Sequence, residues 1–65
     1  MREWLVSARK EKGLSQADIS KRLHIKQPSY WAYENGKAQP KPATAKRIAS
    51  VLGIDWTRFY DESAP

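Results

Sequence analysis

The chain has 65 residues, which allows one domain with a thin core, because a domain of about 60 residues buries only about 60% of the surface that its unfolded chain exposes. It has no cysteine and one histidine, which excludes a disulfide framework, a thiolate metal cage and a zinc site held by His24 alone. The formal net charge is +5, and ten Lys or Arg residues lie between Arg9 and Arg47, a distribution that fits a polyanionic partner or a basic surface that only aids solubility.

Apolar residues recur at helical spacing along the chain and nowhere alternate over the length of a strand, which predicts an all-α domain of five short helices. The first helix is expected from about Arg2 to Lys12, and Gly13 ends it in a left-handed cap. Ser15 has the chemistry of an N-cap, and Asp18 has the position of its reciprocal partner. These signals predict a second helix over about 16–23.

A tight turn over about 23–26 leads into the third helix, which begins at Gln27 or Pro28 because proline is tolerated in the first turn of a helix. The breaker Asn35-Gly36 ends this helix. Tyr30 and Tyr33 lie three residues apart and are expected on its core side, with their hydroxyls at the rim of the core.

The remaining residues predict two more helices. Pro42 opens the fourth helix and Gly53 ends it, and the apolar residues between them recur at the spacing of one buried face. A short fifth helix is expected from about Asp55 to Tyr60, with Asp55 as its cap. We interpret residues 1–60 as one domain and residues 61–65 as a frayed acidic tail.

The sequence does not indicate an enzyme. It has no nucleophile placed beside a base, no pair of carboxylates that the fold would bring together and no glycine-rich phosphate loop. We therefore expect no catalytic activity and no cofactor. No apolar run approaches the roughly 20 residues that cross a bilayer, and no signal peptide is recognised, so a cytoplasmic protein with no membrane contact is expected.

A set of residues from the second to the fourth predicted helix carries a resemblance to a known family. Its members are Leu14, Ser15, Gln16, Ile19, Leu23, Ile25, Gln27, Glu34, Asn35, Gly36, Lys37, Pro40, Leu52 and Gly53. In order and spacing this set resembles the phage repressor and Cro family, the lambda-repressor-like helix-turn-helix domains, over about residues 5–59. The resemblance implies a compact five-helix DNA-binding domain whose helix-turn-helix spans about 16–34. Its third helix is then the recognition helix, which lies in the major groove.

Three positions depart from the family's pattern. Ser20 stands where alanine is usual in the second helix, and it is small enough to keep the two helices close. His24 stands where the turn usually has glycine, and histidine is among the few other residues enriched at positive φ. Lys26 occupies the usual Ser or Thr cap, and Pro28 follows Gln27, so the family's reading geometry does not transfer directly to Gln27.

The resemblance implies base contacts from the start of the third helix and phosphate contacts around it. Gln27 suits this role because an amide can bind adenine N6 and N7 together. The implied base contacts are Gln27, Pro28, Ser29, Trp31 and Ala32. The phosphate contacts that it implies are Gln16, Asn35, Gly36 and Lys37, with exposed backbone N–H groups expected at Asn35 and Gly36. The neighbouring Tyr33, Lys26 and Lys41 are candidates for added phosphate contacts. Without the resemblance, the polar residues near the caps would be interpreted as ordinary exposed side chains.

Two further points stay open at the level of sequence. Trp31 either packs on sugar and methyl groups of DNA or folds back into the core. The resemblance implies a partly buried ion pair between Arg9 and Glu34 that ties the first helix to the end of the third, whereas the alternative is two separate solvated charges.

The function that we favour from the sequence is a sequence-specific regulator of transcription that binds double-stranded DNA, a repressor of phage or host type. One helix-turn-helix unit reads only a half-site, so a homodimer on a palindromic operator is expected. The candidates for a dimer contact are Trp56, Phe59 and Tyr60, of which Trp56 and Phe59 are favoured as core. The alternative is a protein-interaction module of the same fold, an antitoxin or adaptor whose main ligand is a protein.

Overall fold

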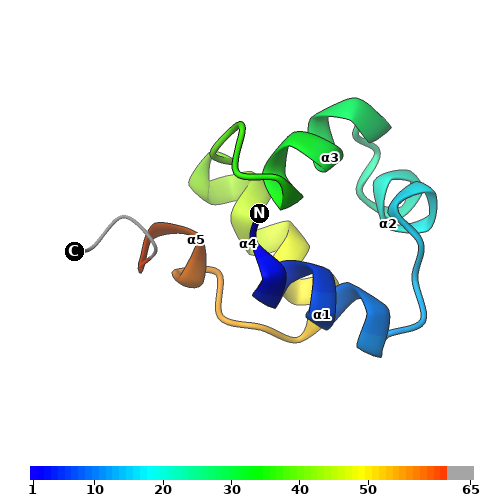
Figure 1. Ribbon diagram of the computed structural model, residues 1–65, viewed down its shortest axis with the longest axis horizontal. Coiled ribbons are helices and arrows are strands. Elements are labelled where there is room, and N and C mark those ends of the chain that lie inside the picture. The colour runs from blue at the N-terminus through cyan, green and yellow to red at the C-terminus, as the bar shows by residue number, and fades with distance from the viewer. Residues whose placement is uncertain (62–65) are drawn as a thin grey trace.

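The computed structural model describes residues 1–61, which form α-helices and no strand (Figure 1). The helices are α1 (Glu3–Glu11), α2 (Gln16–Leu23), α3 (Gln27–Glu34), α4 (Pro42–Leu52) and α5 (Arg58–Asp61). The predicted all-α architecture with five helices is confirmed for this part of the chain. Of the predicted acidic tail, residues 62–65 lie outside the described residues.

The start of α5 differs from the prediction. The Asp55 side chain does not cap the helix; its Oδ1 accepts from the Thr57 N–H at 2.9 Å and from the Thr57 hydroxyl at 2.7 Å. This local turn delays the helix to Arg58, because an aspartate side chain competes with helical hydrogen bonding when it bonds to the backbone two residues on. Asp61, predicted to be part of the tail, is instead the last residue of α5.

The start of α2 follows the predicted capping box. The Asp18 N–H donates to Ser15 Oγ at 3.0 Å, and the Ser15 N–H donates to Asp18 Oδ2 at 2.9 Å. These bonds satisfy two backbone donors that the helix cannot satisfy itself. The hydrogen bond from the Ser15 backbone also lowers the pKa of Asp18, so the box is strongest when that carboxyl is ionised.

The turn between α2 and α3 is tight and is fixed by side chains from two helices. His24 has a φ of 56°, in the left-handed region, which agrees with its place where the resembling family usually has glycine. Arg47 on α4 donates to the carbonyl oxygen of Leu23, at the end of α2. Ser20 is only 3% exposed, so its small side chain allows the close approach of α2 and α3 that the sequence predicts.

Replacing His24 with glycine is expected to raise the free energy of unfolding by about 1 kcal/mol. The left-handed conformation destabilises a residue that has a Cβ by roughly 1–2 kcal/mol, and glycine relieves this strain. The larger conformational entropy of glycine in the unfolded chain offsets part of the gain in stability. Urea unfolding of the two proteins measures the difference. His24→Ala, which keeps the Cβ, serves as the control and should bring no gain; a His24→Gly variant that is less stable than the parent would contradict the expectation.

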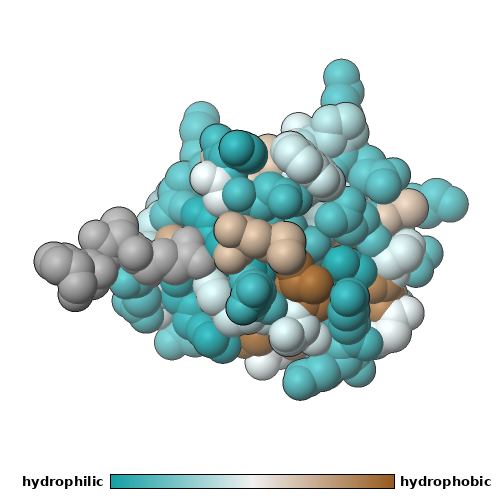
Figure 2. Space-filling view, in the orientation of Figure 1, coloured by the Kyte–Doolittle hydropathy of each residue, from teal (hydrophilic) through white to brown (hydrophobic). Residues whose placement is uncertain are grey.

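The core lies where all five helices meet. Its buried members are Leu5, Ala8, Ile19, Leu23, Tyr30, Ala45, Ile48, Leu52 and Phe59. Trp4 packs edge to face on Phe59, with ring centroids 5.0 Å apart. The face seen in Figure 2 is mostly hydrophilic and shows only small hydrophobic areas, as expected when the apolar side chains are gathered inside.

The two tyrosines of α3 contribute differently to this core. Tyr30 is fully buried, as predicted, whereas Tyr33 is half-buried against the core cluster. The prediction that the Tyr30 hydroxyl reaches the rim is wrong. That hydroxyl is buried and has no hydrogen-bond partner of good geometry within residues 1–61. Burial and the neighbouring Glu34 carboxylate raise the pKa of Tyr30 far above its usual value.

The segment between α3 and α4 is fixed from both ends of the chain. Arg2 is 7% exposed, and its backbone N–H donates to the Glu34 carbonyl oxygen at 2.6 Å. Its guanidinium donates to the carbonyl oxygens of Tyr33 and Ala38 and to Gln39 Oε1. Gln39 in turn donates through Nε2 to the Phe59 carbonyl oxygen at 2.7 Å. These bonds place the loop after α3 in a defined position.

Candidate nucleic-acid interface

The start of α3 is an exposed polar edge of the molecule. Figure 1 shows α3 along the upper side, with α2 beside it and α1 on the opposite side. Gln27, Pro28 and Ser29 are all exposed in the first turn. Lys26 occupies the N-cap position but makes no side-chain cap hydrogen bond, and α3 begins at Gln27 with Pro28 next. The Ser29 N–H donates to the Lys26 carbonyl oxygen at 3.0 Å and Pro28 has no N–H, so the first turn presents mainly the Gln27 amide and the Ser29 hydroxyl to an external ligand.

A shallow, open groove of about 390 Å³ runs between the starts of α2 and α3. It is lined by Gln16, Gln27, Pro28 and Trp31. Trp31 is 45% exposed, which settles the open alternative against a core position. Ala32, beside it, is half-buried. The residues that the sequence assigns to base contact thus share one side of the molecule, and most of them are accessible.

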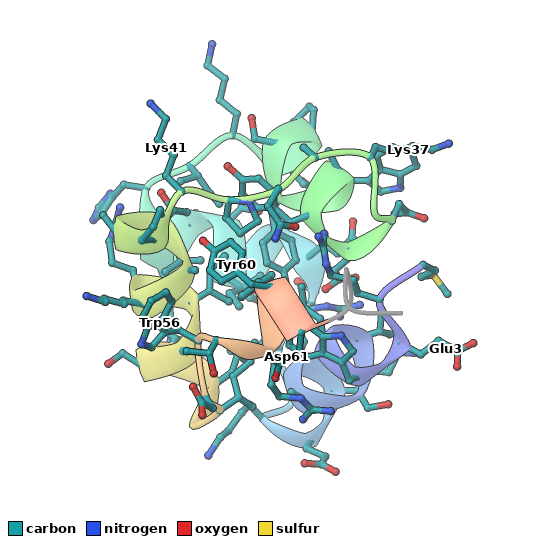
Figure 3. The ribbon with its side chains drawn as sticks, turned by 90° about the vertical axis from the view of Figure 1, so that its left-hand side faces the viewer. Glu3, Lys37, Lys41, Trp56, Tyr60 and Asp61 are labelled. Carbon is teal, nitrogen blue, oxygen red and sulfur yellow. The ribbon has the colours of Figure 1, made fainter. Side chains whose placement is uncertain are left out.

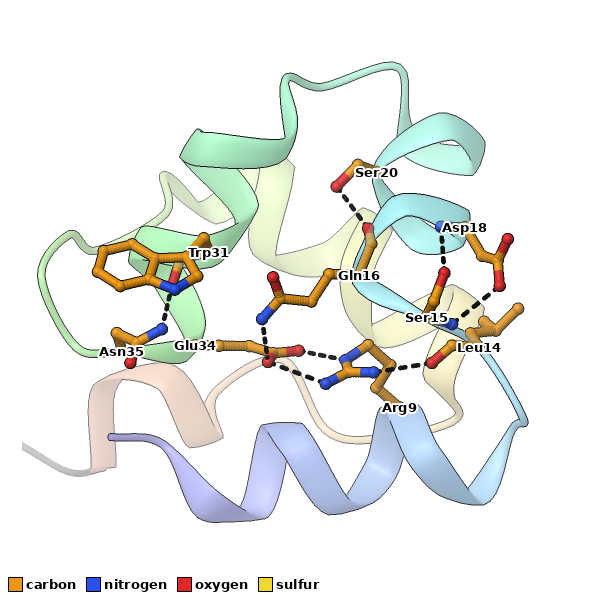
Figure 4. A network of polar contacts seen from close by, with 9 residues as sticks. All are labelled: Arg9, Leu14, Ser15, Gln16, Asp18, Ser20, Trp31, Glu34 and Asn35. Atoms are coloured by element: carbon orange, nitrogen blue, oxygen red, sulfur yellow. Dashed lines mark hydrogen bonds and ion pairs between the residues drawn. The ribbon is translucent and has the colours of Figure 1, made fainter.

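Beneath this groove lies an ion pair between Arg9 on α1 and Glu34 on α3 (Figure 4). Arg9 Nε donates to Glu34 Oε2 at 2.6 Å, and Arg9 Nη2 donates to Glu34 Oε1 at 3.3 Å. Arg9 and Glu34 are 9% and 1% exposed, so the pair is more buried than the resemblance implies. A third bond from Arg9 Nη1 reaches the carbonyl oxygen of Leu14 at 2.8 Å. The pair therefore links α1, the start of α2 and the end of α3.

The electrostatics of the pair favour its charged form. Burial alone raises the pKa of Glu34, but its hydrogen bonds, that from Arg9 first, and the charge of Arg9 together lower it, so that the net pKa lies below the usual value. The hydrogen bond to Glu34 raises the pKa of Arg9. Glu34 is thus an ionised acceptor whose charge is neutralised inside the protein.

Gln16 connects this ion pair to the groove. Its Nε2 donates to Glu34 Oε1 at 3.0 Å, and the side chain is half-buried (Figure 4). Because a carboxylate only accepts hydrogen bonds, this contact fixes the orientation of the Gln16 amide, with Nε2 toward Glu34. One amide hydrogen and the Oε1 acceptor remain for a ligand in the groove. The sequence gives no sign of this link, which joins residues 18 positions apart.

The loop that follows α3 corrects one prediction and supports another. The Asn35 N–H is not exposed, because it donates to the Trp31 carbonyl oxygen at 3.0 Å, and Asn35 Nδ2 donates to the same oxygen at 2.9 Å. The Gly36 N–H has no acceptor among residues 1–61. Gly36 has a φ of 71°, and a Cβ added to it would meet nothing within 4 Å, so it is the left-handed backbone and not crowding that favours glycine here.

Three lysines surround the start and end of α3. Lys26, Lys37 and Lys41 are all exposed. Figure 3 shows the side chains of Lys37 and Lys41 extending away from the fold. Glu34 is the only acidic residue between Asp18 and Asp55, and it is buried and paired. No exposed carboxylate from residues 19–54 therefore opposes the lysines.

The match to known proteins covers most of the chain. A family model described as helix-turn-helix matches residues 5–59. The chain belongs to the lambda-repressor-like helix-turn-helix family. Within the matched residues, α2 and α3 are joined by the tight turn that contains His24.

Three relatives illustrate how far the similarity extends. The uncharacterized HTH-type transcriptional regulator YqaF of Bacillus subtilis (strain 168) is 39% identical over 95% of this chain and 82% of its own length. Multiprotein-bridging factor 1c of Arabidopsis thaliana is 39% identical over 83% of this chain but only 36% of its own length. The uncharacterized HTH-type transcriptional regulator YqaE of the same Bacillus strain is 36% identical over 80% of this chain and 45% of its own length. No solved structure matches the chain significantly.

The candidates for a dimer contact occupy different positions in the helix-turn-helix domain. Phe59 is 1% exposed, which confirms the favoured core position and removes it from the candidates for a dimer contact. Trp56 and Tyr60 are half-buried and pack edge to face with centroids 5.8 Å apart (Figure 3). The Tyr60 hydroxyl donates to the Pro40 carbonyl oxygen at 2.8 Å, and Lys46 Nζ lies 4.9 Å from the centroid of the Trp56 ring.

Residues 1–61 contain neither a membrane-spanning helix nor a cluster of metal ligands. None of the helices there has the length and apolar character needed to cross a membrane. In the same range, no three His, Asp or Glu side chains are grouped so that they would hold a metal ion.

Proposed function

We propose that this protein is a sequence-specific regulator of transcription, a repressor, that inserts the first turns of α3 into the major groove of double-stranded DNA. The proposal rests on one observation: polar side chains that can contact bases are exposed on a positively charged surface to which residues 19–54 contribute no exposed carboxylate. Gln27 and Ser29 are exposed at the start of α3, and Glu34, the one acid of that helix, is withdrawn into an ion pair. A groove about 12 Å wide admits such a helix.

The proposed contacts follow the geometry of this surface. Base edges are met by Gln27, Pro28, Ser29, Trp31 and Ala32. Phosphates are met by Gln16, Lys26, Tyr33, Asn35, Gly36, Lys37 and Lys41. Asn35 would contribute through its remaining side-chain N–H and Gly36 through its free backbone N–H, because the Asn35 backbone N–H is already used. The functional unit is residues 1–60, with the helix-turn-helix over 16–34.

A homodimer on a palindromic operator is part of the proposal. One motif reads a half-site only, and two copies spaced by about 34 Å read successive turns of one groove. Trp56 and Tyr60 are the aromatic residues of the α5 region that keep partial exposure for such a contact. Sedimentation of the protein with and without its duplex should show two copies per operator. If only monomers are found, both free and on DNA at high concentration, the proposed homodimer is wrong.

Gln27→Ala is expected to relax base preference, whereas Lys37→Ala is expected to weaken binding to all sequences alike. The first change removes an amide that can make paired hydrogen bonds to a base, worth about 1–3 kcal/mol at one position. The second removes one phosphate contact and lowers the log–log salt slope by about 0.9. Selection from random duplexes, followed by affinity measurements at several salt concentrations, distinguishes these effects.

The matched control is Lys10→Ala, because Lys10 is exposed and belongs to α1, the helix that lies on the opposite side of the molecule from α3 (Figure 1). It should leave both base preference and salt slope nearly unchanged. Equal weakening on every sequence by Gln27→Ala and Lys37→Ala would refute the reading role of Gln27. A protein that selects no duplex at all would refute the proposed function.

A second candidate function is a protein-interaction module, an antitoxin or adaptor. Its support is that the Arabidopsis relative is named a multiprotein-bridging factor and a Yarrowia lipolytica relative a putative multi-protein-binding factor. This chain spans only 36% and 33% of those two proteins. Loss of all duplex selection together with an intact fold would favour this second function.

A further inference from the structure

The three tryptophans of the protein differ in their surroundings. Trp4 packs on Phe59 and has the Arg58 guanidinium 4.8 Å from its ring centroid, and Trp56 packs on Tyr60 and Lys46. Trp31 has no such ring or cation partner among residues 1–61. It is also 45% exposed. Among the tryptophans, the fold therefore leaves Trp31 uncovered, in the middle of the polar helix α3.

The position of Trp31 relates it to the reading residues. It lies one helical turn after Gln27 and Pro28, and all three line the same groove. A separation of three or four residues places side chains on one face of a helix, with a rise of about 6 Å over four residues. Base pairs are about 3.4 Å apart along the duplex, so a residue one turn after Gln27 meets the next one or two base pairs.

Only one apolar group is offered by the edges of normal bases in the major groove, the C5 methyl of thymine. We propose that Trp31 and Pro28 form an apolar reader for a thymine methyl group, next to the base that Gln27 contacts. This inference rests on the proposed function and specifies part of its ligand. Neighbouring A·T pairs suit both elements, because the adenine of one pair offers N6 and N7 to an amide and the thymine of the next pair presents its methyl in the same groove.

Charge complementarity identifies the occupant of the groove as duplex DNA. Lys26, Lys37 and Lys41 are exposed around α3, and Glu34 beneath the groove is already neutralised by Arg9. The apolar side chains of Trp31 and Pro28 lie among these lysines. This arrangement fits a ligand that has an anionic backbone and carries a methyl group between its two strands. Removing one methyl from such a contact should weaken binding by about three- to fivefold, the equivalent of one buried methylene.

The test uses the whole chain and a duplex selected by it. Each thymine is replaced in turn by uracil, which removes the methyl and keeps every hydrogen-bonding group. One or two positions should lose about three- to fivefold in affinity with the parent protein, and Trp31→Ala should lose this methyl sensitivity. Lys37→Ala is the matched control and should retain the sensitivity while it weakens all duplexes. Circular dichroism and urea unfolding check that Trp31→Ala is folded.

Two results would overturn the inference while leaving the proposed function intact. In one, the parent protein binds selectively through Gln27 but prefers thymine to uracil at no position. In the other, Trp31→Ala retains the full methyl sensitivity. Failure to select any duplex would remove both the proposed function and this inference.

Discussion

Arg9→Met is expected to lower the free energy of unfolding by about 3–5 kcal/mol, because it leaves the buried Glu34 carboxylate without its cation. Glu34 is 1% exposed and loses two hydrogen bonds in this variant, those of 2.6 and 3.3 Å from Arg9. A domain of this size has a total stability of only about 3–10 kcal/mol. Urea unfolding at several concentrations of a stabilising osmolyte, extrapolated to zero osmolyte, measures the difference in stability between Arg9→Met and the parent protein.

The pH dependence gives this prediction a second readout. In the parent protein the folded pKa of Glu34 lies below the unfolded value of about 4.5, so the unfolded chain binds more protons in acid. The contribution of the pair is therefore fully present above that value and is lost as pH falls through the folded pKa. In Arg9→Met, burial dominates and favours the neutral acid. The difference in stability between the two proteins should consequently shrink from pH 7 to pH 3.

Two controls separate the pair from a general effect of charge. Lys10→Met removes an exposed cation from the same helix and should change stability by no more than about 0.5 kcal/mol. Arg9→Met combined with Glu34→Leu replaces both charges with apolar groups and should recover most of the loss. A difference between Arg9→Met and the parent that is the same at pH 7 and pH 3 would contradict the role assigned to Glu34.

Phe59→Ala is expected to lower the free energy of unfolding by about 3–5 kcal/mol, the usual cost of emptying a large core position. Phe59 is the only buried residue of the four-residue helix α5. Its ring packs on Trp4, and Arg2 Cζ lies 5.5 Å from its centroid. Losing the ring removes the main apolar attachment of α5. Urea unfolding followed by circular dichroism measures the stability of the variant and of the parent protein.

Tyr60→Phe is the matched variant for the same helix. It keeps the aromatic ring and removes only the hydrogen bond to the Pro40 carbonyl oxygen, at a cost of about 1 kcal/mol. Phe59→Ala should therefore be clearly the more damaging of the two. If the two variants are equally stable, α5 does not depend on Phe59 for its attachment.

Features set by neighbouring residues were predicted well from the sequence. The Ser15–Asp18 capping box and the stop at Gly53 depend on bonds and dihedral angles within one turn of chain. The left-handed His24 was suggested by the resemblance, because the family usually has glycine there. The start of α5 was missed for a reason that is also local. Asp55 has two uses for its carboxylate, a helix cap or a tight turn with Thr57, and residue type alone does not choose between them.

Long polar side chains that bond to distant carbonyl oxygens could not be predicted. Arg2, Gln39 and Arg47 each donate to a main-chain oxygen of another segment. Every residue carries such an oxygen, so neither spacing nor residue type identifies the partner. The same limit applies to Gln16, whose residue type suggests an outward amide and whose contact with Glu34 depends on the packing of α2 against α3.

Arg2 has a practical bearing on how the protein is prepared. Met1 is 74% exposed, whereas Arg2 is 7% exposed and bonds to the loop that carries Gly36 and Lys37. An affinity tag joined ahead of Met1 would extend into solvent and would leave the contacts of Arg2 in place. Proteolytic trimming past Arg2, or an expression plasmid that starts after it, would remove the hydrogen bonds from Arg2 to Ala38 and Gln39. If the proposed function holds, we expect this loss to change how the affinity for DNA depends on salt.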